Sequence, residues 1–499
     1  MNRPLWLNDA IFYEIYPSSF CDSNADGMGD INGIRQKLPY VKDLGCNALW
    51  LNPCFDSPFK DGGYDVRDYK RVAPRYGTNE ELGALFAEAH RLGIRVLLDL
   101  VPGHTSEEHP WFKRSGQAER NEFSDRYIWT DFWIKGTPGH PYIGGETPRN
   151  GTYMLNFFKC QPALNYGWAR ISESWQTPMD APAARATRDA MADVMRFWLE
   201  MGCDGFRVDM ADSLIKGDEP DKRHTAALWR ELLGELRRAY PEAAFVSEWG
   251  HPEQALAAAG FDMDFYLDHW GNGYNRLLRA EDAYLTGTDP MAFVTDYLDR
   301  YEASKAFGYI SFITGNHDTP RISHYLTEAQ LKLAYALLFT LPGVPFLYYG
   351  DEIGMRYLQD LPTKEGGYTR TGSRTPMQWA PGQNLGFSAG PSDALYLPVD
   401  RLADAPTAAE QAATPGSLLN TVKAILALRH GEKDLQADGP LEILHAKAGD
   451  PLLIYRRGGR VLAVNPSERS AETKLAGEPR FLIGAFSRGV LGPWSFVVI

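Results

Sequence analysis

Short runs of apolar residues alternate with amphipathic stretches along most of the chain. The runs are bounded by turn residues, which is typical of buried parallel strands, while the stretches between them repeat apolar residues every three or four positions, as helices do. Residues 189–201 carry methionine, valine and tryptophan at helical spacing, and Gly202 follows where the helix should end. The candidate strands are AIFYEIYP, ALWLNP, VLLDLV, GFRVDM, FVSEWG, MDFYL, YISFITGNHD and FLYYGDE.

Strands that alternate with helices over roughly 350 residues predict an α/β fold, an expanded (β/α)8 TIM barrel, for which about 250 residues is typical. A doubly wound open sheet is the alternative. The connection after VLLDLV is long and rich in Gly, Pro and aromatic residues, so we expect an inserted domain after the third strand. Short alternating strands near the end predict a C-terminal antiparallel β domain. The expected domains are the first part of the barrel (1–103), an inserted domain (104–166), the second part of the barrel (167–438) and a β-sandwich (439–499).

The composition restricts the class of partner. The chain has 51 basic and 64 acidic residues and a net charge of −13, which argues against nucleic acid or an acidic membrane. No apolar stretch is long enough to span a bilayer, and the amino terminus lacks the pattern of a secretory signal. The 5 cysteines lack CxxC spacing, which indicates neither a disulfide framework nor a zinc site. We therefore expect a cytoplasmic monomer or homodimer without a nucleotide or redox cofactor.

Polar side chains end several predicted strands, where a (β/α)8 barrel places its reactive groups. Arg207 and Asp209 are two residues apart on one strand, so they share a face, and the arginine favours the ionised carboxylate that a nucleophile requires. Carboxylates from separate strands can divide the cleavage of an acetal among a nucleophile, a proton donor and a stabilising group. One acidic residue alone would more often be a helix cap or a surface ion pair. The residues at these strand ends are Asp99, Arg207, Asp209, Glu248, His317 and Asp318.

Four segments, DLVPGHTS, GFRVDMADS, SEWG and FITGNHDTPR, resemble in order the four sequence regions of the alpha-amylase superfamily, glycoside hydrolase family 13. EIYPSSFCDSNADGMGDINGI, QPALNY and RTPMQW are similar to its oligo-1,6-glucosidase, alpha-glucosidase and trehalose synthase branch. The resemblance covers essentially the whole chain. It implies a retaining double displacement with Asp209 as nucleophile, Glu248 as general acid/base and Asp318 as stabiliser of the transition state. Asp99 is expected to be structural.

The resemblance also implies how the attacked sugar is bound. Arg207 would hold Asp209 ionised, and His104 and His317 would bind hydroxyl groups of the sugar. Glu248 must be protonated to act as an acid, so we expect a crowded pocket to raise its pKa while the pKa of Asp209 stays low.

The narrower motifs indicate where the substrate is cut. In the branch that the chain resembles, the aspartate of the GYDV segment and the arginine of RTPMQW pair across the non-reducing terminal glucose and close the pocket behind it. The matching residues are Asp65 and Arg374, and Tyr64 would stack on the same sugar ring. A loop turn with a core ring is the alternative for Tyr64 and Asp65. A closed pocket predicts exo-action on short alpha-glucosides.

Residues 22–30, DSNADGMGD, alternate oxygen-bearing side chains as in the start of an EF-hand loop, but Gly33 stands where the bidentate glutamate belongs. Related enzymes bind a calcium or magnesium ion in this loop. We expect a structural calcium or magnesium ion here, and a loop of Asx turns without an ion is the alternative. The expected ligands are Asp22, Asn24, Asp26, Met28 and Asp30.

Three positions depart from the family. Gly103 and Ala163 stand where amylases have side-chain oxygens for a calcium between the barrel and the inserted domain, so that metal is expected to be absent. Met210 follows the nucleophile at a position that helps related glucosidases separate alpha-1,4 from alpha-1,6 linkages, so the linkage preference stays open.

The two long connections offer further candidates. The glycines near Arg374, in the connection from Ile353 to about Thr414, suit either a mobile rim over the pocket or an ordered surface excursion. Most aromatic residues of the inserted domain are expected to pack its core, and about one or two to line acceptor subsites. These aromatic residues are Trp111, Tyr127, Trp129, Phe132, Trp133, Tyr142, Tyr153, Phe157 and Phe158.

The favoured function is a retaining alpha-glucosidase that removes the terminal glucose from a small oligosaccharide. A glucosyl-transferring isomerase, such as a trehalose synthase or sucrose isomerase, would use the same three carboxylates but retain the leaving sugar and exclude water. A non-catalytic binding subunit of the same fold is the third possibility, and the intact catalytic positions argue against it.

Overall fold

The computed structural model describes residues 3–132, 136–145, 147–266 and 273–499. Its main sheet has 8 parallel strands in the order β11-β10-β9-β8-β5-β2-β1-β12. A parallel bridge between Ile313 and Phe346 joins the two edges, so the sheet closes into a barrel. This confirms the (β/α)8 barrel and excludes the open sheet. The strands are β1 (Phe12–Ile15), β2 (Ala48–Leu51), β5 (Arg95–Leu100), β8 (Gly205–Val208), β9 (Ala244–Ser247), β10 (Met263–Phe265), β11 (Tyr309–Ser311) and β12 (Phe346–Tyr348).

Each of the eight predicted strand segments overlaps one of these strands. Leu267, the last residue of the predicted MDFYL strand, lies outside the described residues. The residues of β1, β2, β8 and β9 are buried throughout, because parallel strands are covered on one side by helices and on the other by the barrel interior. Their sequences are therefore mostly apolar, and the charged exceptions are Glu14 in β1 and Arg207 in β8.

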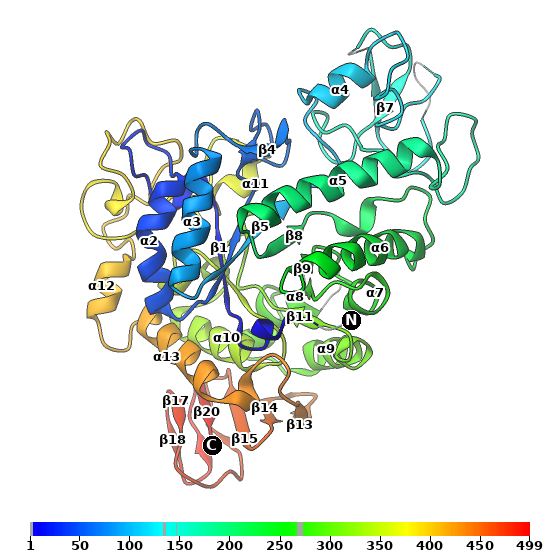
Figure 1. Cartoon of the computed structure of the whole chain (residues 1–499). Helices are drawn as coiled ribbons and strands as arrows, with labels where there is room; N and C mark the ends of the chain where they lie inside the picture. Colours follow the sequence, from blue (N-terminus) through cyan, green and yellow to red (C-terminus); the bar gives the residue numbers. More distant parts are fainter. Residues whose placement is uncertain (1–2, 133–135, 146, 267–272) are drawn as a thin grey trace.

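Helices surround the barrel and begin and end at recognisable signals (Figure 1). The predicted helix before Gly202 is α5, and it ends there because Gly202 adopts a φ of 115° and its N–H bonds back to Trp198 and Leu199. Capping boxes open α3 and α10. The helices outside the barrel are α2 (Ile31–Leu44), α3 (Asn79–Arg91), α5 (Pro182–Met201), α6 (Arg223–Ala239), α7 (Pro252–Gln254), α8 (Gly273–Leu278), α9 (Met291–Ser304), α10 (Glu328–Thr340) and α13 (Leu418–Gly431).

Aromatic side chains fill the barrel interior. The ring of Phe265 lies 5.3 Å from Trp50 and 4.9 Å from Phe346, and Phe346 stacks on Phe12 at 4.3 Å. The ring of Trp50 also lies 5.9 Å from that of His317. This aromatic core therefore directly supports the polar residues at the strand ends.

Two long connections leave the barrel. Between β5 and β8 the chain forms a separate lobe with α4 (Pro110–Ser115), β6 (Tyr142–Gly144) and β7 (Thr152–Met154), which stands out from the barrel in Figure 1. After β12 the chain passes through η6 (Asp351–Ile353), α11 (Tyr368–Thr371), η7 (Gln383–Gly386) and α12 (Ala408–Ala413) before it reaches α13.

The C-terminal strands form two antiparallel sheets, in the orders β13-β14-β15-β20-β17 and β16-β19-β18. They lie at the opposite end of the molecule from the lobe that contains α4 and β7 (Figure 1). This confirms the C-terminal β domain. Its strands are β13 (Glu442–Lys447), β14 (Asp450–Arg457), β15 (Arg460–Asn465), β16 (Ala471–Glu472), β17 (Phe481–Ile483), β18 (Phe486–Ser487), β19 (Val490–Leu491) and β20 (Ser495–Val498).

Among the helices of the described ranges, none combines the length and the apolar character that a bilayer span requires.

Gly205 is a position where only glycine fits. It opens β8 with a φ of 140°, and an added Cβ would lie 1.9 Å from the carbonyl oxygen of Ala244 on β9. We expect Gly205→Ala to lower the free energy of unfolding by about 3 kcal/mol or more, because β8 and β9 would have to separate. Urea denaturation measures this change.

The matched control is Gly431→Ala at the end of α13, where an added Cβ meets no heavy atom within 4 Å. We expect this variant to unfold within about 1 kcal/mol of the wild type. Equal destabilisation by both substitutions would contradict the close approach of β8 and β9.

Candidate active site

One guanidinium group holds three carboxylates at the ends of neighbouring strands. Arg207 Nη1 lies 2.9 Å from Asp99 Oδ1 and 2.9 Å from Asp209 Oδ1, and Nη2 lies 2.9 Å from Glu248 Oε2. The backbone N–H of Met210 also donates to Glu248 Oε2 at 2.9 Å. The three carboxylates converge because β5, β8 and β9 are adjacent in the barrel. The Arg207 side chain is only 1% exposed, so solvent does little to weaken these interactions.

The charges gathered around Arg207 change the expected pKa of Asp209. Burial and the nearby carboxylate of Glu248 raise the pKa of Asp209, while Arg207 lowers it, and the net direction is upward. The prediction that Asp209 keeps a low pKa is therefore wrong for the site without substrate. One guanidinium cannot neutralise three neighbouring carboxylates, so the pKa of Asp209 is raised despite its contact with Arg207.

Asp318 lies in the opposite charge environment. Its Oδ1 contacts Arg374 Nη2 at 3.0 Å and Arg370 Nε at 3.2 Å, and its Oδ2 contacts His317 Nε2 at 3.1 Å. Burial alone would raise the pKa of Asp318, but the charge and hydrogen bond of His317, together with both arginines, lower it well below its usual range. Asp318 is therefore ionised.

His317 supports the site from behind the pocket wall. Its Nδ1 lies 3.0 Å from Glu14 Oε1, and its Nε2 lies 2.7 Å from the hydroxyl of Tyr64. Burial lowers its pKa, but Asp318 and Glu14 outweigh this effect and raise the value to about 9. Both ring nitrogens are already bonded and the side chain is 0% exposed. The structure therefore does not place His317 where it would bind sugar hydroxyls directly.

His104 reaches the pocket as a neutral ring. Burial lowers its pKa to about 3. Nε2 lies 3.2 Å from the carbonyl oxygen of Tyr64 and Nδ1 lies 3.0 Å from Asn156 Nδ2. Since a carbonyl only accepts, the proton belongs on Nε2 and Nδ1 accepts from Asn156.

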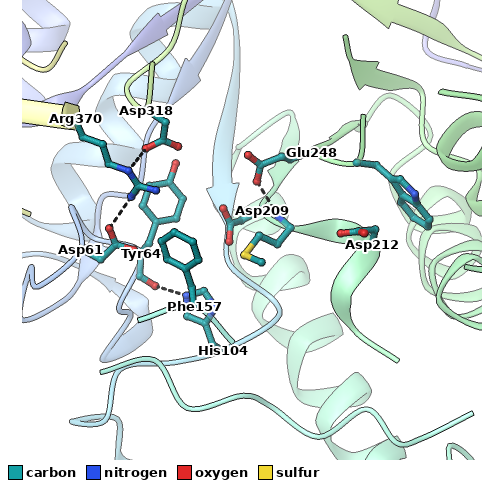
Figure 2. A pocket seen from close by; sticks show the side chains of 11 residues that line it. Asp61, Tyr64, His104, Phe157, Asp209, Asp212, Glu248, Asp318 and Arg370 are labelled. Atoms are coloured by element: carbon teal, nitrogen blue, oxygen red, sulfur yellow. Dashed lines mark hydrogen bonds and ion pairs between the residues drawn. The ribbon is translucent and has the colours of Figure 1, made fainter. Parts of the chain in front are cut away.

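These groups surround a cavity of 280 Å³. Figure 2 shows Asp209, Glu248 and Asp212 on one side, and Asp61, Arg370, Asp318 and Tyr64 across from them. The full lining consists of Asp61, Tyr64, His104, Phe157, Asp209, Met210, Asp212, Glu248, Trp249, Asp318 and Arg370. Of the predicted residues, the catalytic three, Tyr64 and His104 line the cavity, whereas Asp65, Arg207, His317 and Arg374 are buried behind it.

The predicted pairing of Asp65 with Arg374 is wrong. Asp65 accepts hydrogen bonds from the backbone N–H groups of Lys60 and Asp61 and from the Ser57 hydroxyl, so it folds its own loop. Arg374 donates to the backbone carbonyl groups of His317 and Glu365 as well as to Asp318.

The aspartate and arginine that pair in the cavity lining are instead Asp61 and Arg370, with Asp61 Oδ1 at 3.1 Å from Arg370 Nη1. Arg370 also bonds Asp318 from the same guanidinium group. Asp61 precedes Asp65 by four residues, and Arg370 precedes Arg374 by four. The sequence thus offers two aspartates and two arginines, and no local pattern chooses between them.

Residues 14–438 match the alpha amylase catalytic-domain family. The chain belongs to this family. It is therefore an enzyme of the glycosidase class.

The relatives include enzymes of two kinds. The trehalose synthase/amylase TreS of Mycolicibacterium smegmatis is 31% identical over an alignment 473 positions long, which covers 85% of this chain and 76% of that protein. A probable alpha-glucosidase of Rhizobium meliloti is 31% identical over an alignment 501 positions long, which covers 89% of this chain and 85% of that protein. Among solved structures, an inactive double mutant of MutB, from Pseudomonas mesoacidophila, in complex with isomaltulose has a TM-score of 0.82 and 25% identity over 99% of each chain.

One aromatic residue of the inserted lobe lines the cavity. Phe157 is 45% exposed, and it packs edge to face on Phe158 with a centroid distance of 4.5 Å. Tyr127, Trp129 and Tyr153 are buried in the core of the lobe, as expected for the majority. Trp133 lies outside the described residues.

Lys216 ties the inserted lobe to the barrel near Gly103. A Cβ on Gly103 would lie 2.7 Å from Asn156 Nδ2, so the asparagine occupies the space beside the glycine. Lys216 Nζ donates to Asn156 Oδ1 at 3.2 Å and to the carbonyl oxygen of Ser213 at 2.6 Å. Burial lowers the pKa of Lys216 to about 8, which leaves it largely protonated at neutral pH.

The loop of residues 22–30 is closed by its own hydrogen bonds. Both oxygens of Asp22 accept from backbone N–H groups of the loop, and one also accepts from the Ser388 hydroxyl. Asp30 accepts from Ser23 and from the N–H of Gly33, which caps α2. The remaining predicted ligands bond within the loop. In the described ranges, no three His, Cys, Asp or Glu side chains converge to hold a metal ion. The predicted metal ligands do not fit a metal ion in this conformation, and the metal ion stays a prediction.

A chelator distinguishes the two accounts of this loop. If the hydrogen bonds within the loop are enough to hold its conformation, the melting temperature is unchanged in excess EDTA. The geometry favours this outcome. A bound cation at about 100 times its Kd would contribute about 2.7 kcal/mol. A lower melting temperature that calcium restores would therefore establish the predicted ion.

Proposed function

We propose that the protein is a retaining, exo-acting alpha-glucosidase of short alpha-glucosides. The observation that carries this proposal is the ion pair of Asp61 and Arg370. The pair lines the cavity across from Asp209 and Glu248, and we infer that it meets the terminal sugar, so that the cavity accommodates the end of a chain and not its middle.

Asp209 and Glu248 can perform the two displacements. The Asp209 carboxylate attacks the anomeric carbon while Glu248 donates its proton to the glycosidic oxygen, and the glycosidic bond breaks. A water molecule then attacks the same carbon, Glu248 takes its proton, and the bond to Asp209 breaks. Each displacement inverts the carbon, so the product keeps the α configuration.

Asp318 is suited to interact with the sugar as an anion. Its lowered pKa keeps it charged over the range in which the enzyme would work. Positive charge develops on the sugar in the oxocarbenium-like transition state, and a preorganised anion stabilises that charge more than it stabilises the neutral ground state.

A glucosyl-transferring isomerase is the second candidate. It is supported by the similarity to a trehalose synthase/amylase and by the fold shared with MutB in complex with isomaltulose. The difference would lie in the groups that meet the acceptor, for which the cavity lining offers Met210, Asp212 and Trp249. If these residues retain the released sugar and exclude water, that sugar attacks the glycosyl-enzyme in place of water.

Product analysis separates the two functions. We expect maltose to give free glucose, with the α anomer released first, by NMR spectroscopy. We also expect glucose release from maltose or isomaltose to exceed dye release from soluble starch. If the main product is trehalose from maltose, or isomaltulose or trehalulose from sucrose, the protein is an isomerase and not a hydrolase. Faster attack on starch would contradict exo-action.

The roles of the two carboxylates can be tested with a substrate that needs no acid. Alpha-glucosyl fluoride has a good leaving group, so its cleavage depends on Asp209 and little on the proton donor. We expect Glu248→Gln to lower kcat on maltose by about 10³-fold but still to release fluoride in a burst. Asp209→Asn should lose both reactions. A fluoride burst from Asp209→Asn, with none from Glu248→Gln, would reverse the assignment.

A further inference from the structure

We propose that Glu365 is a positioning residue that fastens the segment carrying Arg370 and thereby sets how tightly the cavity holds the terminal sugar. The inference rests on the proposed function, because it assigns a role in binding that sugar. Glu365 lies in the long connection after β12 and does not itself line the cavity.

The Glu365 carboxylate joins three separate parts of the chain. Its Oε2 accepts from the hydroxyl of Tyr16, at the end of β1, at 2.5 Å. Its Oε1 accepts from Arg75 Nη1 at 2.8 Å and from the hydroxyl of Tyr396 at 2.6 Å. The side chain is 3% exposed. A carboxylate that is buried in a surface excursion requires such partners, because leaving it unpaired would be strongly destabilising.

The backbone at Glu365 is held in a strained conformation against the pocket wall. Its φ is 48°, which non-glycine residues rarely adopt and which persists only where the surroundings enforce it. Its carbonyl oxygen accepts from Arg374 Nη1 at 2.6 Å. At Gly366, with a φ of 101°, an added Cβ would lie 2.3 Å from Asp61 Oδ1. The backbone therefore runs directly beside Asp61 at this point.

This anchor determines where Arg370 lies. Arg370 follows on the short α11, and its guanidinium bridges Asp61 at 3.1 Å and Asp318 at 3.2 Å. A four-residue helix cannot fix its own position. The packing of the preceding turn against the barrel must do so, and the Glu365 carboxylate supplies the bonds from this turn to Tyr16 and Arg75.

The test compares two buried carboxylates in the same connection. Glu365→Gln keeps the size of the side chain and removes its charge. Asp400→Asn is the control, because Asp400 is also 3% exposed and binds an arginine, Arg356, at 2.7 Å, but lies outside this network. We expect Glu365→Gln to raise the KM for maltose about fivefold with kcat changed less than about twofold, since sugar binding is weakened in ground and transition states alike. Asp400→Asn should leave KM within about twofold.

A double-mutant cycle tests whether the effect passes through Arg370. If Glu365 acts by placing that guanidinium, Glu365→Gln adds no further rise in KM once Arg370→Met is present. Should Glu365→Gln fail to fold, Tyr396→Phe removes one of the hydrogen bonds to the carboxylate and should raise KM in the same direction by a smaller factor.

The outcomes are distinct. A wild-type enzyme that turns over no alpha-glucoside would refute the proposed function. An active wild type whose Glu365→Gln and Asp400→Asn variants have the same KM, or a Glu365→Gln effect that is fully additive with Arg370→Met, would refute this inference alone.

Discussion

The arrangement of the active site depends on the unequal numbers of cations around its carboxylates. On one side a single buried guanidinium, that of Arg207, contacts three carboxylates, those of Asp99, Asp209 and Glu248. Across the cavity one carboxylate, that of Asp318, contacts two arginines and a histidine. Neither arrangement would be stable if the groups were fewer or misplaced, because an unpaired buried charge is strongly destabilising. The barrel makes both possible by bringing the ends of its strands together.

The unequal numbers of cations explain why the pKa values of Asp209 and Asp318 shift in opposite directions. Burial acts to raise the pKa of both Asp209 and Asp318. Where negative charges outnumber the guanidinium, the pKa of Asp209 is raised, and where cations outnumber the carboxylate, the pKa of Asp318 is lowered. The first side can therefore hold a proton and the second cannot. A glycosidic bond cleaved by double displacement needs this division, with an exchangeable proton beside the anomeric carbon and a fixed negative charge opposite it.

The sequence predicted the fold and the strand ends whose side chains line the cavity because both depend on local patterns. An apolar run that ends in an acidic residue indicates a barrel strand with a side chain at its rim, and Gly202 marks the end of a helix without knowledge of its neighbours. Which aspartate and arginine pair in the cavity lining depends on how two loops meet. Asp61 and Arg370 differ from Asp65 and Arg374 only in which side chain faces the cavity and which bonds its own loop. The direction of the Asp209 pKa was also missed, because it requires counting charges contributed by three strands.

The choice between hydrolysis and isomerisation is made by groups other than these charges. In the proposed mechanism both reactions form the same bond to Asp209 and use Glu248 as the same proton donor, so these two groups would not distinguish water from a sugar as acceptor. Access and retention on the open side can do so. Met210 lines the cavity with its side chain, and its backbone N–H also holds Glu248. Because every residue except proline supplies that N–H, a side-chain substitution at Met210 would change the groups that meet the acceptor and leave the hydrogen bond to Glu248 in place.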